Sequence, residues 1–184
     1  MTIRPAWLVL PMIAVLSALL VADAETIGVA PEPSSAPTSA ASWSEIKWPF
    51  PIDQWGTGRA FRCSAGECGS AVEIYLRPKL GFCNCATGVS DDAELDRVGD
   101  LELLSDTFEG LGEGRAVAVA WMQGRSRPYR VAIRYASPRT ALAIAFNDKC
   151  DVIVATVLTE HVSAGERAAL AFLNSDLVRR WAER

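Results

Sequence analysis

Five cysteines are the residues of this chain whose type and spacing most directly allow chemistry: Cys63, Cys68, Cys83, Cys85 and Cys150. Asn84 alone separates Cys83 from Cys85, and two thiolates at that spacing can bind a soft ion such as copper(I) or exchange with disulfides. Cys150 or Met122 would supply a third ligand for copper. The spacing differs from the C-x2-C pairs of zinc sites and of thioredoxin-like proteins, so neither class is predicted.

The same cysteines also suit a disulfide framework. Cys63 and Cys68 flank a short loop between two expected strands, which predicts a bridge between them. Cys150 is expected to pair with Cys83 or with Cys85, and the remaining cysteine is then a free thiol. We favour this structural interpretation over a copper site or a redox centre made by Cys83 and Cys85.

Charged residues are segregated into two neighbouring stretches. Residues 91–113 contain nine acidic residues and one basic residue, Arg97, whereas residues 114–147 contain six arginines and no acid. We expect the two stretches to lie side by side and to neutralise each other in part. The alternative is an anion-binding surface on Arg125, Arg127 and Arg130, because guanidinium groups bind carboxylates and phosphates well.

Aromatic residues are concentrated at residues 43–55, where prolines oppose helix formation and favour an extended arm. We expect this arm to lie across the domain and to bury its aromatic rings. The alternative is that Trp48 and Trp55 form an exposed aromatic surface for a glycan or a peptide.

No catalytic residue is assigned. The chain has one histidine, His161, and neither a nucleophile-elbow motif nor a phosphate-binding glycine loop accompanies it. A hydrolase that uses His161 is therefore the weakest hypothesis, and a non-catalytic protein is favoured.

The amino-terminal residues predict export. Arg4 precedes an uncharged apolar run over residues 6–22, and Ala22-Asp23-Ala24 fits a signal-peptidase cleavage site. An uncleaved anchor is the alternative, although the run is short for a bilayer and contains Pro11. We therefore predict a signal peptide at 1–24, a Pro/Ser/Ala-rich disordered linker at 25–42 and a single disulfide-stabilised domain at 43–184. The location is then the periplasm or the extracellular space.

Alternating apolar residues predict strands at 59–63, 69–77, 115–123, 129–136, 140–147 and 150–158. A helix near 91–103 is expected to begin with a cap at Asp91, and a carboxy-terminal helix with a capping box formed by Ser163 and Glu166. Residues 174–176 are expected to break that last helix. The predicted fold class is α+β, with a meandering antiparallel sheet of about six strands and the helices packed on one face.

The formal net charge of −4 gives no general attraction to nucleic acid, and no stable membrane insertion is expected after cleavage. The leading hypothesis is a small exported binding or scaffold protein whose partner is an unknown protein or an anionic ligand. The alternative is a thiol-redox or copper-handling accessory protein that uses Cys83 and Cys85.

Overall fold

The computed structural model describes residues 41–132 and 139–182. The predicted signal peptide and residues 25–40 of the predicted linker lie outside these ranges. Within them, no helix is long and apolar enough to cross a bilayer.

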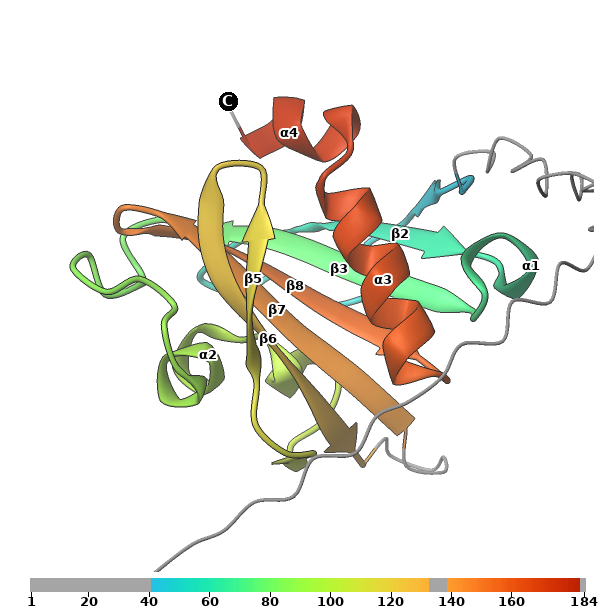
Figure 1. Cartoon of the computed structure of the whole chain (residues 1–184), viewed down its shortest axis with the longest axis horizontal. Coiled ribbons are helices and arrows are strands. Elements are labelled where there is room, and N and C mark those ends of the chain that lie inside the picture. Colours follow the sequence, from blue (N-terminus) through green and yellow to red (C-terminus); the bar gives the residue numbers. More distant parts are fainter. Residues whose placement is uncertain (1–40, 133–138, 183–184) are drawn as a thin grey trace, which may run out of the picture. The chain divides into compact units, whose positions relative to one another are not determined.

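The fold is α+β, as predicted, and is built on one antiparallel sheet (Figure 1). The strand order is β1-β2-β3-β8-β7-β6-β4, and β5 also pairs with β6. The strands are β1 (Ser44–Ile46), β2 (Arg59–Cys63), β3 (Val72–Lys79), β4 (Phe108–Gly110), β5 (Arg115–Val119), β6 (Met122–Val131), β7 (Arg139–Asp148) and β8 (Asp151–Thr159). The sheet thus has eight strands where the sequence predicts about six. The two additional strands, β1 and β4, have three residues each, which is too short for an alternating pattern.

Four α-helices and one 3-10 helix complete the described chain: α1 (Ala65–Cys68), α2 (Asp92–Val98), η1 (Leu101–Leu103), α3 (Val162–Leu173) and α4 (Asp176–Ala182). Asp91 caps α2 as predicted, because its Oδ1 accepts a hydrogen bond of 2.8 Å from the main-chain N–H of Glu94. Gly99 ends α2, so the helix predicted near 91–103 is divided into α2 and η1. The predicted break at 174–176 separates α3 from α4.

The turn between β5 and β6 corrects the sequence prediction, which places a loop at 124–128. The turn lies at Ala120 and Trp121, where Ala120 has a φ of 53°. Residues 124–128 are inside β6, which pairs along its length with β7. Gly124 and Pro128 suggested a loop, but here they are strand residues.

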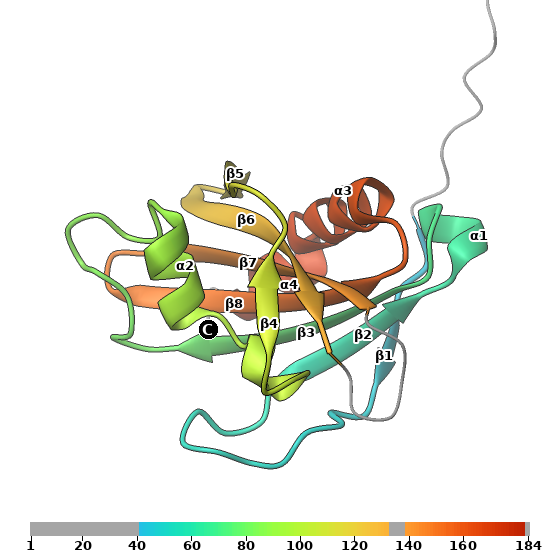
Figure 2. The ribbon, with the colours of Figure 1, turned by 90° about the horizontal axis from the view of Figure 1, so that it is seen from below.

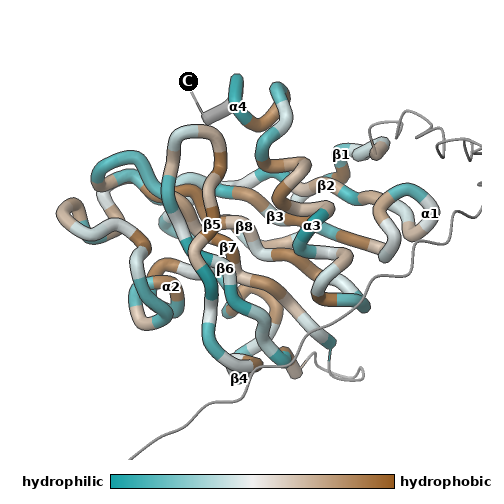
Figure 3. Tube along the Cα trace, viewed as in Figure 1, coloured by the Kyte–Doolittle hydropathy of each residue, from teal (hydrophilic) through white to brown (hydrophobic). Residues whose placement is uncertain are grey.

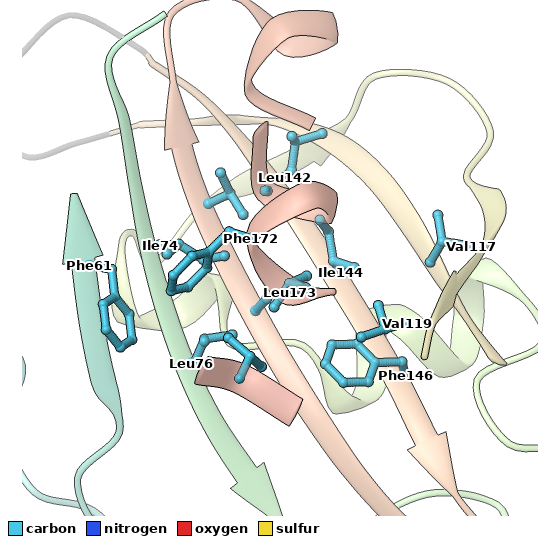
Figure 4. Packing of buried hydrophobic residues seen from close by; sticks show 14 of the residues in the cluster. Phe61, Ile74, Leu76, Val117, Val119, Leu142, Ile144, Phe146, Phe172 and Leu173 are labelled. Carbon is cyan, nitrogen blue, oxygen red and sulfur yellow. The ribbon is translucent and has the colours of Figure 1, made fainter. Parts of the chain in front are cut away.

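The helices cover both faces of the sheet, which corrects the prediction that they share one face. α3 lies across β3, β8 and β7 (Figures 1 and 2). Phe172 and Leu173 of α3 pack on Ile74, Leu142 and Ile144 of these strands (Figure 4). Both faces need cover because β7 and β8 are apolar on both.

The opposite face of β7 is lined by alanines, on which α2 packs. Ala141, Ala143 and Ala145 belong to one buried cluster with Leu95 and Val98 of α2. Small side chains on a strand let a helix approach its backbone closely. Side chains from α2 and from the arm at residues 43–55 can therefore meet side chains of the sheet on this face.

Candidate functional site

Four charged residues form an ion cluster on the face that α2 covers. Arg77 of β3 donates from Nε and Nη2 to the two carboxylate oxygens of Asp100, at 2.6 and 2.7 Å. Its Nη1 lies 2.7 Å from both carboxylate oxygens of Asp53, in the arm. Lys79 Nζ lies 2.6 Å from Asp100 Oδ1 and donates to the main-chain oxygen of Val98 at 2.7 Å. We call Asp53, Arg77, Lys79 and Asp100 the ion cluster.

Three members of the ion cluster are buried, and the fourth, Asp53, is exposed. Arg77 is 1% exposed, and Lys79 and Asp100 are each 2% exposed. Burial opposes the charged form of Arg77, but hydrogen bonds to Asp100 and Asp53 outweigh it and raise the pKa of the guanidinium. The same hydrogen bond from Arg77 lowers the pKa of Asp53. Both groups therefore stay ionised at neutral pH, and the cluster fastens the arm and the α2–η1 connection to β3.

Two aromatic rings cover one end of the ion cluster. The ring centroids of Trp55 and Phe82 lie 4.6 Å apart. Lys79 Nζ lies 5.6 Å from the first centroid and 5.4 Å from the second, so the two rings cover its ammonium group. Ile52 is 76% exposed and Leu80 is 72% exposed. We call Ile52, Trp55, Leu80 and Phe82 the arm surface.

The arm surface is attached directly to the ion cluster along the chain. Ile52 precedes Asp53, and Leu80 follows Lys79. Asp53 also accepts a hydrogen bond of 2.8 Å from the main-chain N–H of Trp55. The exposed side chains of Ile52 and Leu80 thus extend from backbone directly next to two members of the ion cluster.

Trp48 and Trp55, the two tryptophans proposed from the sequence, have different environments. The Trp48 ring meets Phe50 and Tyr75 edge to face, at centroid distances of 5.3 and 6.1 Å. A Cβ atom at Gly58 would lie 2.6 Å from the Trp48 ring, so the absence of a side chain there makes room for it. Trp48 is therefore a packing residue, whereas Trp55 belongs to the arm surface.

The three arginines proposed as an anion-binding surface lie on β6 and already contact acids. Arg125 Nε lies 2.5 Å from Asp92 of α2, and Arg127 Nη1 lies 3.1 Å from Asp96. Figure 3 shows the hydrophilic colouring of β6. The acidic and basic stretches thus lie side by side, as expected. An anion at Arg125 or Arg127 would have to compete with these two carboxylates.

Arg130 is also paired, although at the surface. Its Nη1 lies 3.0 Å from Glu109 of β4, and both side chains are largely exposed.

The acid that pairs with Arg125 is charged. The hydrogen bond from Arg125 lowers the pKa of Asp92, so this α2 acid is ionised at neutral pH. All three arginines therefore have a carboxylate partner.

The cysteines form two disulfides, Cys63–Cys68 and Cys85–Cys150. The predicted bridge between Cys63 and Cys68 is confirmed, and Cys150 takes the second of its two proposed partners. Cys83 is a free, buried thiol, and its Sγ lies 3.3 Å from the main-chain oxygen of Lys149. Since Cys85 is bonded to Cys150, Cys83 and Cys85 are not a pair of free thiols here. Disulfide pairs of this kind are typical of extracellular or periplasmic proteins.

Other candidate chemistry is sparse in the described chain. Residues 41–132 and 139–182 contain no group of three or more His, Cys, Asp or Glu side chains placed to hold a metal ion. His161 is exposed at the start of α3, where its side chain forms no capping hydrogen bond.

The ion cluster and most of the arm surface were missed by the sequence analysis. Alternation along β3 places Arg77 and Lys79 on its polar face, but it does not indicate that a second layer covers that face. Asp53 lies in the proline-rich arm, and Asp100 lies within the helix predicted near 91–103, so neither pattern places them beside β3. The two cations at positions 77 and 79, on the same face of one strand, are the signal that could have drawn attention to this site.

These features define a disulfide-bonded α+β protein with a rigidly supported apolar surface. No protein-family model, no curated protein and no solved structure matches the chain.

Proposed function

We propose that this chain is an exported, non-catalytic binding protein, and that the arm surface holds an apolar segment of a partner protein. The observation that carries the proposal is the exposure of Ile52 and Leu80, at 76% and 72%, in the two segments that also carry the packed rings of Trp55 and Phe82. Tryptophan is enriched among the residues that anchor protein interfaces, and exposed apolar side chains around an anchor exclude water from it.

The ion cluster adds a second argument. Binding costs less when a surface is already held in its bound conformation. Asp53 and Arg77 tie the arm to β3. Lys79 and Asp100 tie β3 to the connection between α2 and η1. A rigid apolar surface therefore supports recognition of a partner without a large ordering cost.

Export is supported by the disulfides and by the amino-terminal sequence. Both bridges would persist in an oxidising compartment. The intact mass of the exported protein is expected to correspond to a chain that begins at Glu25. A mass that includes Met1 would contradict cleavage.

Panning phage-displayed random peptides against the purified protein tests binding by the arm surface. We expect enriched peptides that carry apolar or aromatic anchors. Their binding should fall at least tenfold when Ile52→Ser and Leu80→Ser are combined, which corresponds to about 1.4 kcal/mol. Both side chains are mostly exposed, so the double variant is expected to unfold at the same temperature as the wild type.

Two control variants make the experiment specific. Leu177→Ser removes an exposed leucine on α4, and it should leave peptide binding unchanged. Arg125→Ala combined with Arg127→Ala should also leave it unchanged. Acidic peptides whose binding is lost in the arginine variant would instead favour the anion-binding surface, and a library without enrichment would reject peptide binding by the arm surface.

A further inference from the structure

We propose that Cys83, Cys85 and Cys150 form a thiol–disulfide exchange site, in which the thiol of Cys83 displaces Cys85 from its bridge with Cys150. The new bridge joins Cys83 to Cys150, and Cys85 becomes a free thiol at the surface. This inference is independent of the binding function proposed above. We call these three residues the cysteine cluster.

The backbone brings both alternative partners next to Cys150. The main-chain N–H of Cys83 donates to the main-chain oxygen of Cys150 at 3.2 Å. The Cα atoms of Cys85 and Cys150 lie 4.3 Å apart. Cys150 therefore has one neighbour to which it is bonded and a second that is hydrogen-bonded to its backbone.

The loop that carries Cys83 and Cys85 is fixed against α2. The main-chain N–H of Asn84 donates to Glu94 Oε1 at 2.8 Å, and the main-chain N–H of Gly88 donates to the oxygen of Asn84 at 2.7 Å. The main-chain N–H of Gly81 donates to Asp151 Oδ1 at 2.7 Å and so ties the same segment to the start of β8. Exchange between the two bridges then needs local side-chain movement rather than a new fold.

Burial differs between the two alternative partners of Cys150. Cys83 is 6% exposed, whereas Cys85 belongs to the exposed residues. The thiol is therefore protected in the bridge that the structure contains. After exchange the free thiol would be at position 85, where solvent and other molecules can reach it.

The exchange step is balanced and needs no oxidant. The Cys83 thiolate attacks Cys150 Sγ, a bond between these two sulfurs forms, and the bond between Cys85 and Cys150 breaks. The electron pair of the broken bond stays on Cys85, which takes up a proton in place of the one that Cys83 lost.

The charged groups around Cys83 make the step depend on pH. Burial raises the pKa of the Cys83 thiol, and the carboxylates of Glu94 on α2 and Asp151 on β8 raise it further. Arg97 on α2 opposes this increase. Since the thiolate is the attacking species, the exchange rate is expected to rise roughly tenfold per pH unit below that pKa.

Labelling of the native wild-type protein with a maleimide, followed by acid quenching and disulfide mapping, tests the proposal. The expected product carries the label on Cys85 and a bridge between Cys83 and Cys150, and it accumulates faster at about pH 8 than at about pH 7. The Cys63–Cys68 bridge serves as the internal reference for an intact fold. Label confined to Cys83, or no label at the higher pH, would overturn the proposal.

Two variants test separately whether Cys83 can reach Cys150 and whether labelling of Cys85 requires the Cys83 thiol. Cys85→Ser is expected to contain a bridge between Cys83 and Cys150, and free thiols at both positions would count against the proposal. Cys83→Ser is the matched control. It should retain the Cys85–Cys150 bridge and take up no maleimide, because it lacks the attacking thiol.

Discussion

The guanidinium group of Arg77 contacts two carboxylates from different segments, the buried Asp100 and the partly exposed Asp53. Replacing Arg77 with alanine would leave Asp100 with Lys79 alone and would remove the cationic partner of Asp53. Breaking a buried pair leaves charge without compensation in a medium that solvates it poorly. We therefore expect Arg77→Ala to lower the free energy of unfolding by about 3–5 kcal/mol, as measured by urea denaturation.

A surface ion pair on the neighbouring strand gives the matched control. Arg62 of β2 lies 2.7 Å from Glu73 of β3, but 59% of the Arg62 side chain is exposed. After Arg62→Ala the carboxylate of Glu73 is still in contact with water and keeps its hydrogen bond from Tyr75, so the change is expected to cost less than about 1 kcal/mol. Equal losses in the Arg77 and Arg62 variants would show that burial does not determine the contribution of the ion cluster.

Gly124 of β6 has no room for a side chain against the backbone of β7. A Cβ atom at this position would lie 2.0 Å from the main-chain oxygen of Ala145 and 2.7 Å from the Cα of Phe146. Both atoms belong to the backbone of the central strand β7, which cannot move without disturbing its pairing with β8. Gly124→Ala is therefore expected to destabilise the protein by roughly 1–3 kcal/mol, as measured by thermal or urea unfolding.

The control for Gly124 is a glycine with free space around it. A Cβ atom at Gly66 in α1 would meet nothing within 4 Å. Gly66→Ala should leave stability unchanged or raise it by up to about 1 kcal/mol, because it restricts the unfolded chain. A neutral Gly124→Ala variant would mean that β6 can move away from β7 at low cost.

Whether the sequence predicts a strand, helix or turn correctly depends on how far along the chain its stabilising contacts lie. The strands of five or more residues and the cap at Asp91 show patterns among residues a few positions apart, and the sequence predicts them, whereas the three-residue strands β1 and β4 show none. The turn at Ala120 was misplaced because Gly124 is required by contact with a distant strand and not by a turn. The capping box at Ser163 and Glu166 was also wrong. His161 occupies the cap position, while Glu166 accepts hydrogen bonds from Arg115 and Ser126 across the sheet.

The candidate site was the least predictable part of the molecule. Its charged members come from the arm, from β3 and from the connection between α2 and η1. They meet because both faces of the sheet are covered, and the order of the strands, with β8 between β3 and β7, fixes which segments meet. Pairing of Cys85 with Cys150 depends on the same topology, and the sequence could only restrict Cys150 to two partners.

The two disulfides act on the whole molecule to very different extents. Cys63 and Cys68 are five residues apart and lie on one hairpin, whereas Cys85 and Cys150 are 65 residues apart and join the loop before α2 to the start of β8. In the chain-entropy description, a bridge restricts the unfolded chain more when it closes a longer loop. The expected contributions to the free energy of unfolding are about 2 kcal/mol for the short loop and about 4 kcal/mol for the long one.

A Cys83→Ser background allows the two contributions to be measured without disulfide exchange. Adding Cys63→Ser and Cys68→Ser to this background removes the short bridge, and adding Cys85→Ser and Cys150→Ser removes the long one. Urea denaturation of the three proteins should show the larger loss when the long bridge is absent. Equal losses would indicate that the unfolded chain already keeps the loop before α2 close to β8, since a bridge between segments that stay together restricts little.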